Sequence, residues 1–345
     1  MKLIPANISV SFVTIMISIL FIIVAPTDVN AFAVHAQKSG ISLSHVRDTT
    51  IDAMHFTEKH IVNRYHKNML PTTTSLSMTA LPSIGQFAAA SFFSGCLGLW
   101  RTGYAVSYGY GGAMLASGLL QLSALRIGAP SQTTLQLHAA IYILYGIRLC
   151  GFLLNREIRL PVEIHQMKRR DASFLERLKR LPIVTGCSAL FFCMAAAPMR
   201  ALALVQPECN ALTISTLAIG FTGFLLAAVG DWYKSKIKAR DGPQKLVTSG
   251  PFRYFRHPNY TGEIIGWTCL CLLLPLMSAG GNIRRVIPWL IPSIIGWAGM
   301  VFAVLMGEAT VDLEKKQKEK YGGTPEYKEW IKSSWSGPMF GSINK

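Results

Sequence analysis

Long apolar blocks separated by short loops dominate this chain. From about residue 84 onward, seven blocks of 17 to 23 residues follow one another, at 84–100, 103–125, 136–154, 183–204, 211–230, 263–279 and 286–306. Each block is long enough to cross a hydrocarbon layer of about 30 Å as a helix. Open strands cannot cross it, because their backbone groups would have no partners. The sequence therefore predicts an all-α, polytopic membrane helical bundle with about seven transmembrane helices.

Basic residues are concentrated in alternate loops. The chain has 34 Lys and Arg against 18 Asp and Glu, a net charge of +16. The excess follows the third, fifth and seventh blocks, so 155–182, 231–262 and the C-terminal tail are predicted to share the cytosolic face or its plastid equivalent. Because topology explains the charge, we expect a lipid bilayer as partner and no nucleic acid. We also expect no metal, since the Cys269-x-Cys271 pair has no His or acidic ligand near it in the sequence.

The first 83 residues have the composition of a targeting sequence. Residues 1–31 are predicted to be a cleavable signal peptide, with an uncleaved anchor as the alternative, because the apolar run 8–24 follows Lys2 and precedes small residues. Residues 32–83 form a transit-like or flexible segment with 13 Ser and Thr and five Lys and Arg against three Asp and Glu. Ala31-Phe32-Ala33 resembles the junction of bipartite plastid presequences. We expect a plastid membrane, with the endoplasmic reticulum as the alternative.

The rest of the chain is predicted to consist of two membrane segments and a short tail. Residues 84–133 are predicted to be N-terminal membrane helices on the substrate side, 134–335 a C-terminal membrane domain with the functional residues, and 336–345 a tail. The most informative stretch, 246–267, reads LVTSGPFRYFRHPNYTGEIIGW. Pro258 suits the first position of a helix. Arg253, Arg256 and His257 therefore precede a helix N-terminus, which favours a bound phosphate.

Charged residues inside apolar blocks need an explanation. Glu263 and Arg148 require a partner or a function there, because ionisable groups deep in a bilayer cost about 2.5–3.5 kcal/mol on insertion scales. Asn259 and Glu263 stack on one side of the predicted helix, next to Tyr260. The alternatives are an interfacial acid and arginines that only anchor the topology. Basic clusters around 231–238 and 314–330 lie on the same predicted face, so a polyanionic cofactor fits there.

The segment 250–267 resembles the C-terminal domain of the steroid 5α-reductase superfamily, with its RHPNYxGExxxW pattern. The resemblance covers roughly 134–335 and includes YGIRLCGFLLNREIR and EKYGGTPEYKEW. It implies a membrane oxidoreductase that uses NADPH to reduce a carbon–carbon double bond conjugated to a carbonyl, in a lipophilic substrate such as a sterol, terpenoid or lipid. The cofactor-binding residues that it implies are Asp231, Lys238, Arg253, Arg256, His257, Asn259, Tyr260, Glu263 and Tyr327.

The resemblance leaves the catalytic residues unassigned. In the steroid enzymes a Tyr and a Glu from the N-terminal helices donate hydrogen bonds to the carbonyl, but the first three blocks here contain no Glu. Tyrosines are present in these blocks at Tyr104, Tyr108, Tyr110, Tyr142 and Tyr145. The last block is expected to end at Met306-Gly307-Glu308, without the Arg and His that the steroid enzymes carry there.

Two other functions are compatible with the same residues. A methyltransferase of the isoprenylcysteine carboxyl or phospholipid type shares the RHPxYxG start and binds S-adenosylmethionine, which has a cationic sulfonium and no phosphate. The combination of Asn259, Glu263 and Trp267 favours the reductase. A non-catalytic lipid-binding protein is the third hypothesis, and it leaves Glu263 and Arg148 unexplained.

Overall fold

The structure, a computed structural model, describes residues 81–125, 132–158 and 173–337. The predicted signal peptide, most of the segment 32–83 and most of the tail 336–345 lie outside the described residues. The chain divides into two units, Met1–Met78 and Thr79–Lys345, and all described residues belong to the second. In this part of the chain the elements are helices, with only an isolated bridge between Phe255 and Trp335. The predicted all-α class is confirmed.

Each of the seven predicted apolar blocks lies in one helix or in consecutive helices. The first four blocks lie in α4 (Ile84–Gly95) with α5 (Leu97–Trp100), α6 (Thr102–Val106) with α7 (Tyr108–Ser123), α8 (Thr133–Ile158) and α11 (Leu181–Val205). The fifth lies in α12 (Ala211–Asp241), the sixth in α13 (Pro258–Trp267), the π-helix η3 (Thr268–Leu273) and α14 (Leu274–Ala279), and the seventh in α15 (Ile283–Ala298) with the π-helix η5 (Gly299–Ala309). The short elements are α10 (Phe174–Leu178), η2 (Gly250–Arg253) and η4 (Gly280–Asn282).

The protein is an integral membrane protein by the length and hydropathy of these helices. In the described ranges, four helical segments are long and apolar enough to cross a bilayer: Thr133–Ile158, Phe174–Val205, Ala211–Asp241 and Pro258–Tyr321. The last of them reverses at η4 and so supplies two antiparallel arms. The shorter apolar segment Ile84–Trp100 joins them.

Two helices extend further than the apolar pattern predicts. The helix α12 continues beyond its apolar block to Asp241, and the last arm continues through η5 into α16 (Thr310–Tyr321). The expectation that the last helix ends at Met306-Gly307-Glu308 is therefore wrong. The reason is that α16 consists largely of Glu, Lys and Gln, which are good helix formers and stay helical in water. A final helix, α17 (Pro325–Ser333), is capped by the Thr324 side chain.

Small residues let α12 and α13 pack very closely. A Cβ atom added to Gly262 would lie 2.3 Å from the carbonyl oxygen of Gly223, and one added to Gly223 would lie 2.7 Å from that of Gly262. Side chains at these positions would force the two helices apart, as at other membrane interfaces built from small residues. This close packing brings the N-terminus of α13 against α12, where the charged residues described below are found.

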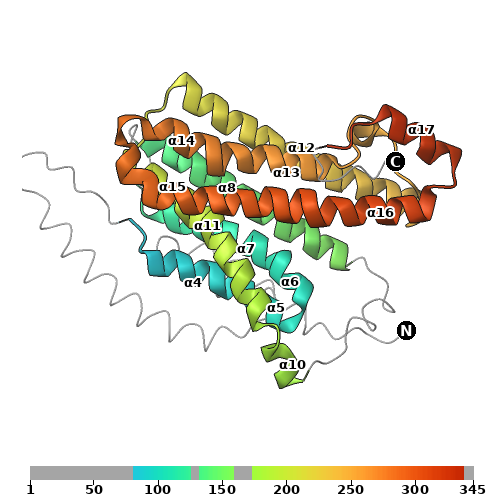
Figure 1. The fold of residues 1–345 in the computed structure, drawn as a ribbon, viewed down its shortest axis with the longest axis horizontal. Helices are drawn as coiled ribbons and strands as arrows, with labels where there is room; N and C mark the ends of the chain where they lie inside the picture. The colour runs from blue at the N-terminus through green and yellow to red at the C-terminus, as the bar shows by residue number, and fades with distance from the viewer. Residues whose placement is uncertain (1–80, 126–131, 159–172, 338–345) are drawn as a thin grey trace, which may run out of the picture. The chain divides into compact units, whose positions relative to one another are not determined.

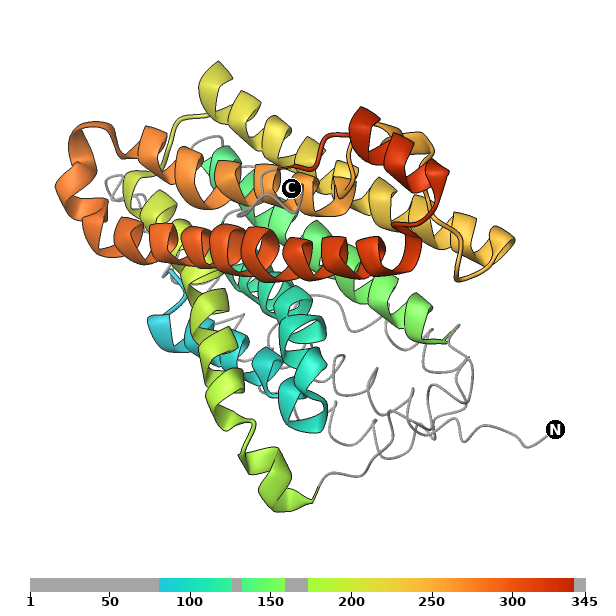
Figure 2. The same ribbon diagram turned by 45° about the vertical axis from the view of Figure 1, so that its right-hand side comes forward.

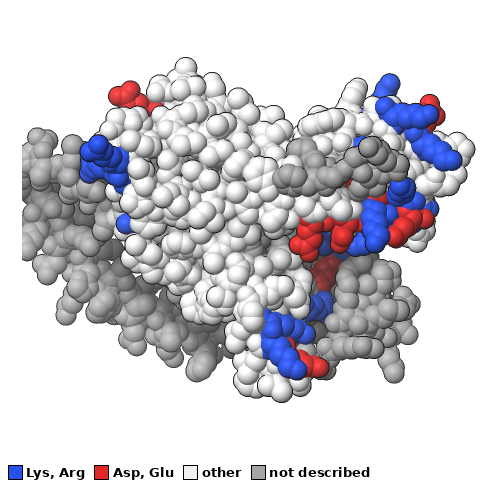
Figure 3. All heavy atoms as spheres, viewed as in Figure 1, with Lys and Arg blue, Asp and Glu red and all other residues white. Residues whose placement is uncertain are grey.

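Most of the helix ends that carry charge lie at one end of the bundle, whereas Arg284 and Arg285 begin α15 at the other end. In two views α12, α13 and α16 run side by side, whereas α11 crosses the bundle obliquely (Figures 1 and 2). Figure 3 shows Lys, Arg, Asp and Glu near the ends of α12, α16 and α17, and a largely uncharged surface over the middle of the helices. We call this end the charged face, and it is the face that the loop charges predict.

Candidate functional site

One arginine joins two carboxylates from neighbouring helices. The Arg148 guanidinium of α8 donates to an Asp231 carboxylate oxygen of α12 at 2.5 Å, and its other terminal nitrogen lies 4.0 Å from a Glu263 oxygen of α13. Glu263 is only 9% exposed. We call these three residues the Arg148 cluster. Arg148 and Glu263 thus each have a partner of opposite charge inside the apolar region. The cluster also brings together Asp231 and Glu263, two of the predicted cofactor-binding residues.

The side of the Arg148 cluster toward the bundle core is aromatic. Trp267, one turn after Glu263, is fully buried and packs against the rings of Tyr110, Tyr145 and Phe224 at centroid distances of 5.9, 4.9 and 4.8 Å. The indole nitrogen of Trp267 has no hydrogen-bond partner in the described part of the chain, and the hydroxyls of Tyr110 and Tyr145 lie near each other and near Glu263. A buried donor without a partner is costly, at about 1–3 kcal/mol. It therefore marks a place that suits a polar group of a ligand.

The RHPN turn, residues 256–259, is held by an acid from α16. Glu314 of α16 accepts from Arg256 at 3.0 Å and lies 2.7 Å from the His257 ring nitrogen, and all three side chains are at most 5% exposed. The helix α13 begins at Pro258, as predicted. Arg256 and His257, predicted to hold phosphates, thus have a carboxylate partner within the protein. Phosphate binding by these two residues stays a prediction.

The other predicted residues of this segment differ in position. Arg253 is exposed in η2, whereas Tyr260 is half-buried with its ring stacked on His257. The backbone nitrogen of Asn259 is packed against Gly230 of α12, beside Asp231. Asn259 and Tyr260 therefore border the Arg148 cluster, and Arg253 lies away from the buried interior.

Tyr327 belongs to a cap formed by the C-terminal helix. It is 3% exposed and packs with Leu246 and Trp330, whose indole nitrogen donates to the Phe252 carbonyl at 2.7 Å. Burial raises the pKa of Tyr327 above its usual value, and the nearby Glu314 raises it further while Arg256 lowers it. The hydroxyl therefore stays protonated at neutral pH. This cap encloses the segment between α12 and α13.

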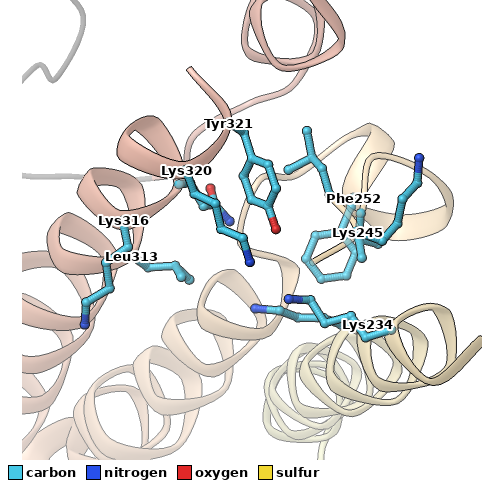
Figure 4. A pocket seen from close by; sticks show the side chains of 11 residues that line it. Lys234, Lys245, Phe252, Leu313, Lys316, Lys320 and Tyr321 are labelled. Carbon is cyan, nitrogen blue, oxygen red and sulfur yellow. The ribbon is translucent and has the colours of Figure 1, made fainter. Parts of the chain in front are cut away.

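A lysine-lined cavity of about 170 Å³ opens between the end of α12, the segment 245–252 and α16. Figure 4 shows the ammonium groups of Lys234 and Lys320 directed into it and that of Lys245 directed away. Phe252, Leu313 and Tyr321 supply its less polar walls. We call it the lysine cavity. The five lysines that line it are Lys234, Lys238, Lys245, Lys316 and Lys320.

Few carboxylates balance the charge of the lysine cavity. Within the described residues, Lys245 is the one lysine of the five with a carboxylate oxygen within 4.0 Å, that of Glu326 at 3.7 Å. Lys238 donates to the Pro243 carbonyl, and the Lys320 ammonium lies over the Tyr321 ring. Converging ammonium groups repel one another, so the cavity favours an anion. Of its lysines, sequence reasoning named only Lys238 as a site residue.

One face of α12 connects the lysine cavity to the Arg148 cluster. Asp231, Lys234 and Lys238 are spaced i, i+3 and i+7 and so project from the same side of the helix. At 1.5 Å per residue, Asp231 and Lys238 are about 10 Å apart along the axis. The structure thus aligns a buried acid–arginine cluster with a cationic cavity along one helix.

A second acidic cluster was missed in the sequence because Glu157 follows the third apolar block. Its carboxylate accepts from Arg101 at 3.0 Å, from Tyr108 at 2.9 Å and from Tyr104, beside a cavity of about 540 Å³. This cluster combines Tyr with Glu, whereas the first three apolar blocks contain Tyr but no Glu. However, nine residues at about 100° each turn Glu157 to the side of α8 opposite Arg148. The two clusters therefore face different parts of the bundle.

In the described part of the chain no group of His, Cys, Asp and Glu is arranged to hold a metal.

Comparison with known proteins identifies a family but no individual relative. No curated protein and no solved structure matches the chain. A family model described as "Protein of unknown function (DUF1295)" matches residues 109–334, which include α7 to α17 and all residues of the Arg148 cluster and the lysine cavity. The chain belongs to this family, which is associated with steroid 5α-reductase-like membrane proteins.

Proposed function

We propose that the chain is an integral membrane, NADPH-dependent oxidoreductase that reduces a carbon–carbon double bond conjugated to a carbonyl in a lipophilic substrate. The observation that carries this proposal is the alignment, along α12, of the Arg148 cluster with the lysine cavity. A dinucleotide has the matching distribution of charge, with phosphates toward one end and a polar, uncharged carboxamide at the other.

The donor groups present fit this cofactor better than S-adenosylmethionine. A phosphate is matched by ammonium groups, which are donors without acceptors; five lysines line the lysine cavity, and the ammonium groups of Lys234 and Lys320 are directed into it. S-adenosylmethionine carries a sulfonium and no phosphate, so it would leave the lysine cavity without an anion. The two carboxylates of the Arg148 cluster are the feature that would suit a sulfonium. For that reason the methyltransferase hypothesis is kept in the test below.

The reaction needs a hydrogen-bond donor where negative charge develops. NADPH, when bound, supplies a hydride to the β-carbon, and charge then grows on the carbonyl oxygen of the substrate. Tyr145 is the phenol best placed to protonate this region, because it shares a face of α8 with Arg148, lies beside Glu263 and packs against Trp267. The phenol of Tyr104 is already bonded to Glu157. Glu263, beside Tyr145, would hold the carboxamide of the cofactor.

A lipophilic substrate follows from the surroundings of the Arg148 cluster. Trp267, one turn after Glu263, packs against the rings of Tyr142 and Phe224, and the helices that carry these rings are long and apolar enough to cross a bilayer. We infer that the substrate enters from the membrane, as expected for a sterol, terpenoid or lipid-like molecule.

The test is a pair of titrations of the full chain, purified in detergent. NADPH and S-adenosylmethionine are added separately, and binding is followed by intrinsic tryptophan fluorescence, to which the buried Trp267 contributes. The proposal predicts saturable binding of NADPH and none of S-adenosylmethionine. Saturable binding of S-adenosylmethionine alone would establish the methyltransferase hypothesis, and binding of neither would favour the non-catalytic one.

Glu263 provides a site-directed version of this test. The change Glu263→Gln removes the carboxylate while it keeps the shape of the side chain, and we expect NADPH affinity to fall by about tenfold, since a hydrogen bond to a charged group contributes ~1.5–3 kcal/mol. Glu308→Gln is the matched control, because Glu308 is exposed on the last arm. Unchanged NADPH affinity in Glu263→Gln, with a folded protein, would remove Glu263 from the site.

A further inference from the structure

The lysine cavity has features that select among phosphate groups. Its volume of about 170 Å³ is below the ~300–1,000 Å³ of pockets that enclose a whole small molecule. It therefore accommodates one end of a nucleotide and not all of it. Lysine provides compact point charges, in contrast to the flat fork with which Arg binds two oxygens at once.

A terminal phosphate monoester suits such a cavity better than a pyrophosphate. A monoester carries about −1.5 to −2 charges at pH 7, whereas each phosphate in a pyrophosphate bridge carries a single charge. Lys234, Lys238 and Lys320 supply three cationic groups that have no carboxylate within 4.0 Å in the described part of the chain. The doubly charged monoester therefore gains more electrostatic stabilisation from these three lysines than a singly charged phosphate of a pyrophosphate bridge.

The residues first predicted to bind phosphate are poorly available for it. Arg256 and His257 are nearly completely buried and are both bonded to Glu314. An incoming phosphate would have to compete with that carboxylate for both side chains. No such competition exists for Lys234 and Lys320, whose ammonium groups are directed into the lysine cavity (Figure 4).

We propose that the lysine cavity receives the 2′-phosphate of the adenosine end of the cofactor, and that Lys234, Lys238 and Lys320 make the protein selective for NADPH over NADH. This inference rests on the proposed function for the identity of the whole ligand. The binding of the phosphorylated adenosine itself depends only on the lysine cavity, so it is tested without hydride transfer.

The experiment measures binding of adenosine fragments to the full chain in detergent by calorimetry. Adenosine 2′,5′-bisphosphate is compared with adenosine 5′-diphosphoribose, which lacks the 2′-phosphate and carries its two phosphates in a pyrophosphate bridge. We expect the bisphosphate to bind at least tenfold more tightly and to compete with NADPH. Equal affinities for the two fragments would overturn the proposal.

Lysine variants localise the effect. Lys320→Gln and Lys234→Gln are each expected to weaken binding of the bisphosphate and of NADPH by about tenfold or more, because each removes a charge-assisted hydrogen bond, and to leave NADH affinity unchanged. Lys236→Gln and Lys315→Gln are the controls on the same two helices, since both residues are exposed and do not line the lysine cavity. An equal loss in the control variants, or an equal loss for NADH and NADPH, would overturn the proposal.

The outcomes separate this inference from the proposed function. Binding of NADPH that is insensitive to both lysine substitutions overturns the inference and leaves the oxidoreductase proposal intact. Binding of the bisphosphate that is lost in Lys320→Gln, together with no binding of NADPH or NADH, supports a phosphate site in the lysine cavity and overturns the proposed function.

Discussion

At the scale of single residues, buried charges organise the site. Glu314 joins Arg256 and His257, and Arg148 joins Asp231 and Glu263, so four segments distant in sequence are fixed by two acid–base clusters. Buried ion pairs contribute little net stability when they are intact, but removal of one partner leaves an uncompensated charge. Their contribution is therefore best seen in substitutions.

Glu314→Gln is expected to destabilise the protein more than any exposed acid on the same helix. It leaves the buried Arg256 guanidinium without its carboxylate, and breaking such a pair costs about 3–5 kcal/mol. Thermal unfolding in detergent measures the effect, with Glu319→Gln, an exposed acid of α16, as control. If the two variants unfold at the same temperature, the Glu314 pairs do not stabilise the fold.

Tyr145→Phe is expected to impair reduction and not cofactor binding. It deletes the proposed proton donor and keeps the aromatic contact with Trp267. General acid catalysis contributes about 10²–10⁴-fold, so kcat should fall by at least 10² while NADPH affinity stays within a factor of two or so. Tyr104→Phe is the comparison, because the Tyr104 phenol is bonded to Glu157. A larger loss of kcat in Tyr104→Phe would transfer the role of donor to the Glu157 cluster.

How far the sequence predicts the site depends on the residue. The start of α13 at Pro258 and the need of Glu263 for a partner follow from local rules, namely a proline at a helix start and a charge in an apolar block. The residues that pair with these charged groups do not follow from local rules. Glu314 and Lys320 lie beyond the last apolar block, and a hydropathy pattern does not reveal that the helix continues to Tyr321. Tertiary contacts across more than 50 residues decide which acid meets Arg256.

At the scale of elements, the close approach of α12 and α13 positions the Arg148 cluster. Asp231 and Glu263 come from these two helices, and Arg148 bridges them from α8. The apolar blocks predict that both helices exist. They do not predict that Gly223 and Gly262 face each other, because periodicity alone does not fix which neighbour a helix face meets.

Gly262→Ala is expected to disturb both the fold and the site. The added methyl group would lie 2.3 Å from the Gly223 oxygen, and overpacking of this kind costs about 1–3 kcal/mol. We expect a lower unfolding temperature and weaker NADPH binding in the same variant. Gly186→Ala in α11 is the control, since a Cβ there meets no atom within 4 Å. Equal unfolding temperatures in the two variants would show that α12 and α13 tolerate a wider separation.

At the scale of the whole molecule, most of the charged helix ends lie together on the charged face. The ends of α8, α12, α16 and the start of α13 all lie there, whereas the α11–α12 loop lies at the other end of helices that cross the bundle. The loop charges predicted this arrangement from the sequence, because the positive-inside rule acts on the chain during insertion and needs no tertiary structure.

Cys209 reports the orientation directly. It is exposed in the α11–α12 loop, and it is the most accessible of the seven cysteines, all of which fall in the described ranges. In sealed vesicles, a membrane-impermeant maleimide should label Cys209 from one side and a Lys236→Cys variant, made in a Cys209→Ser protein, from the opposite side. Labelling of both positions from the same side would contradict the topology.

The most direct test of the account is a transfer experiment. The full chain is reconstituted in vesicles with NADPH deuterated at C4 and with lipophilic enones of the sterol, terpenoid and fatty-acyl classes, and the products are analysed by mass spectrometry. The account predicts deuterium on the β-carbon of a reduced product, and loss of that product in Glu263→Gln. A methylated product formed with S-adenosylmethionine in place of NADPH, and no deuterated product from any class, would contradict it.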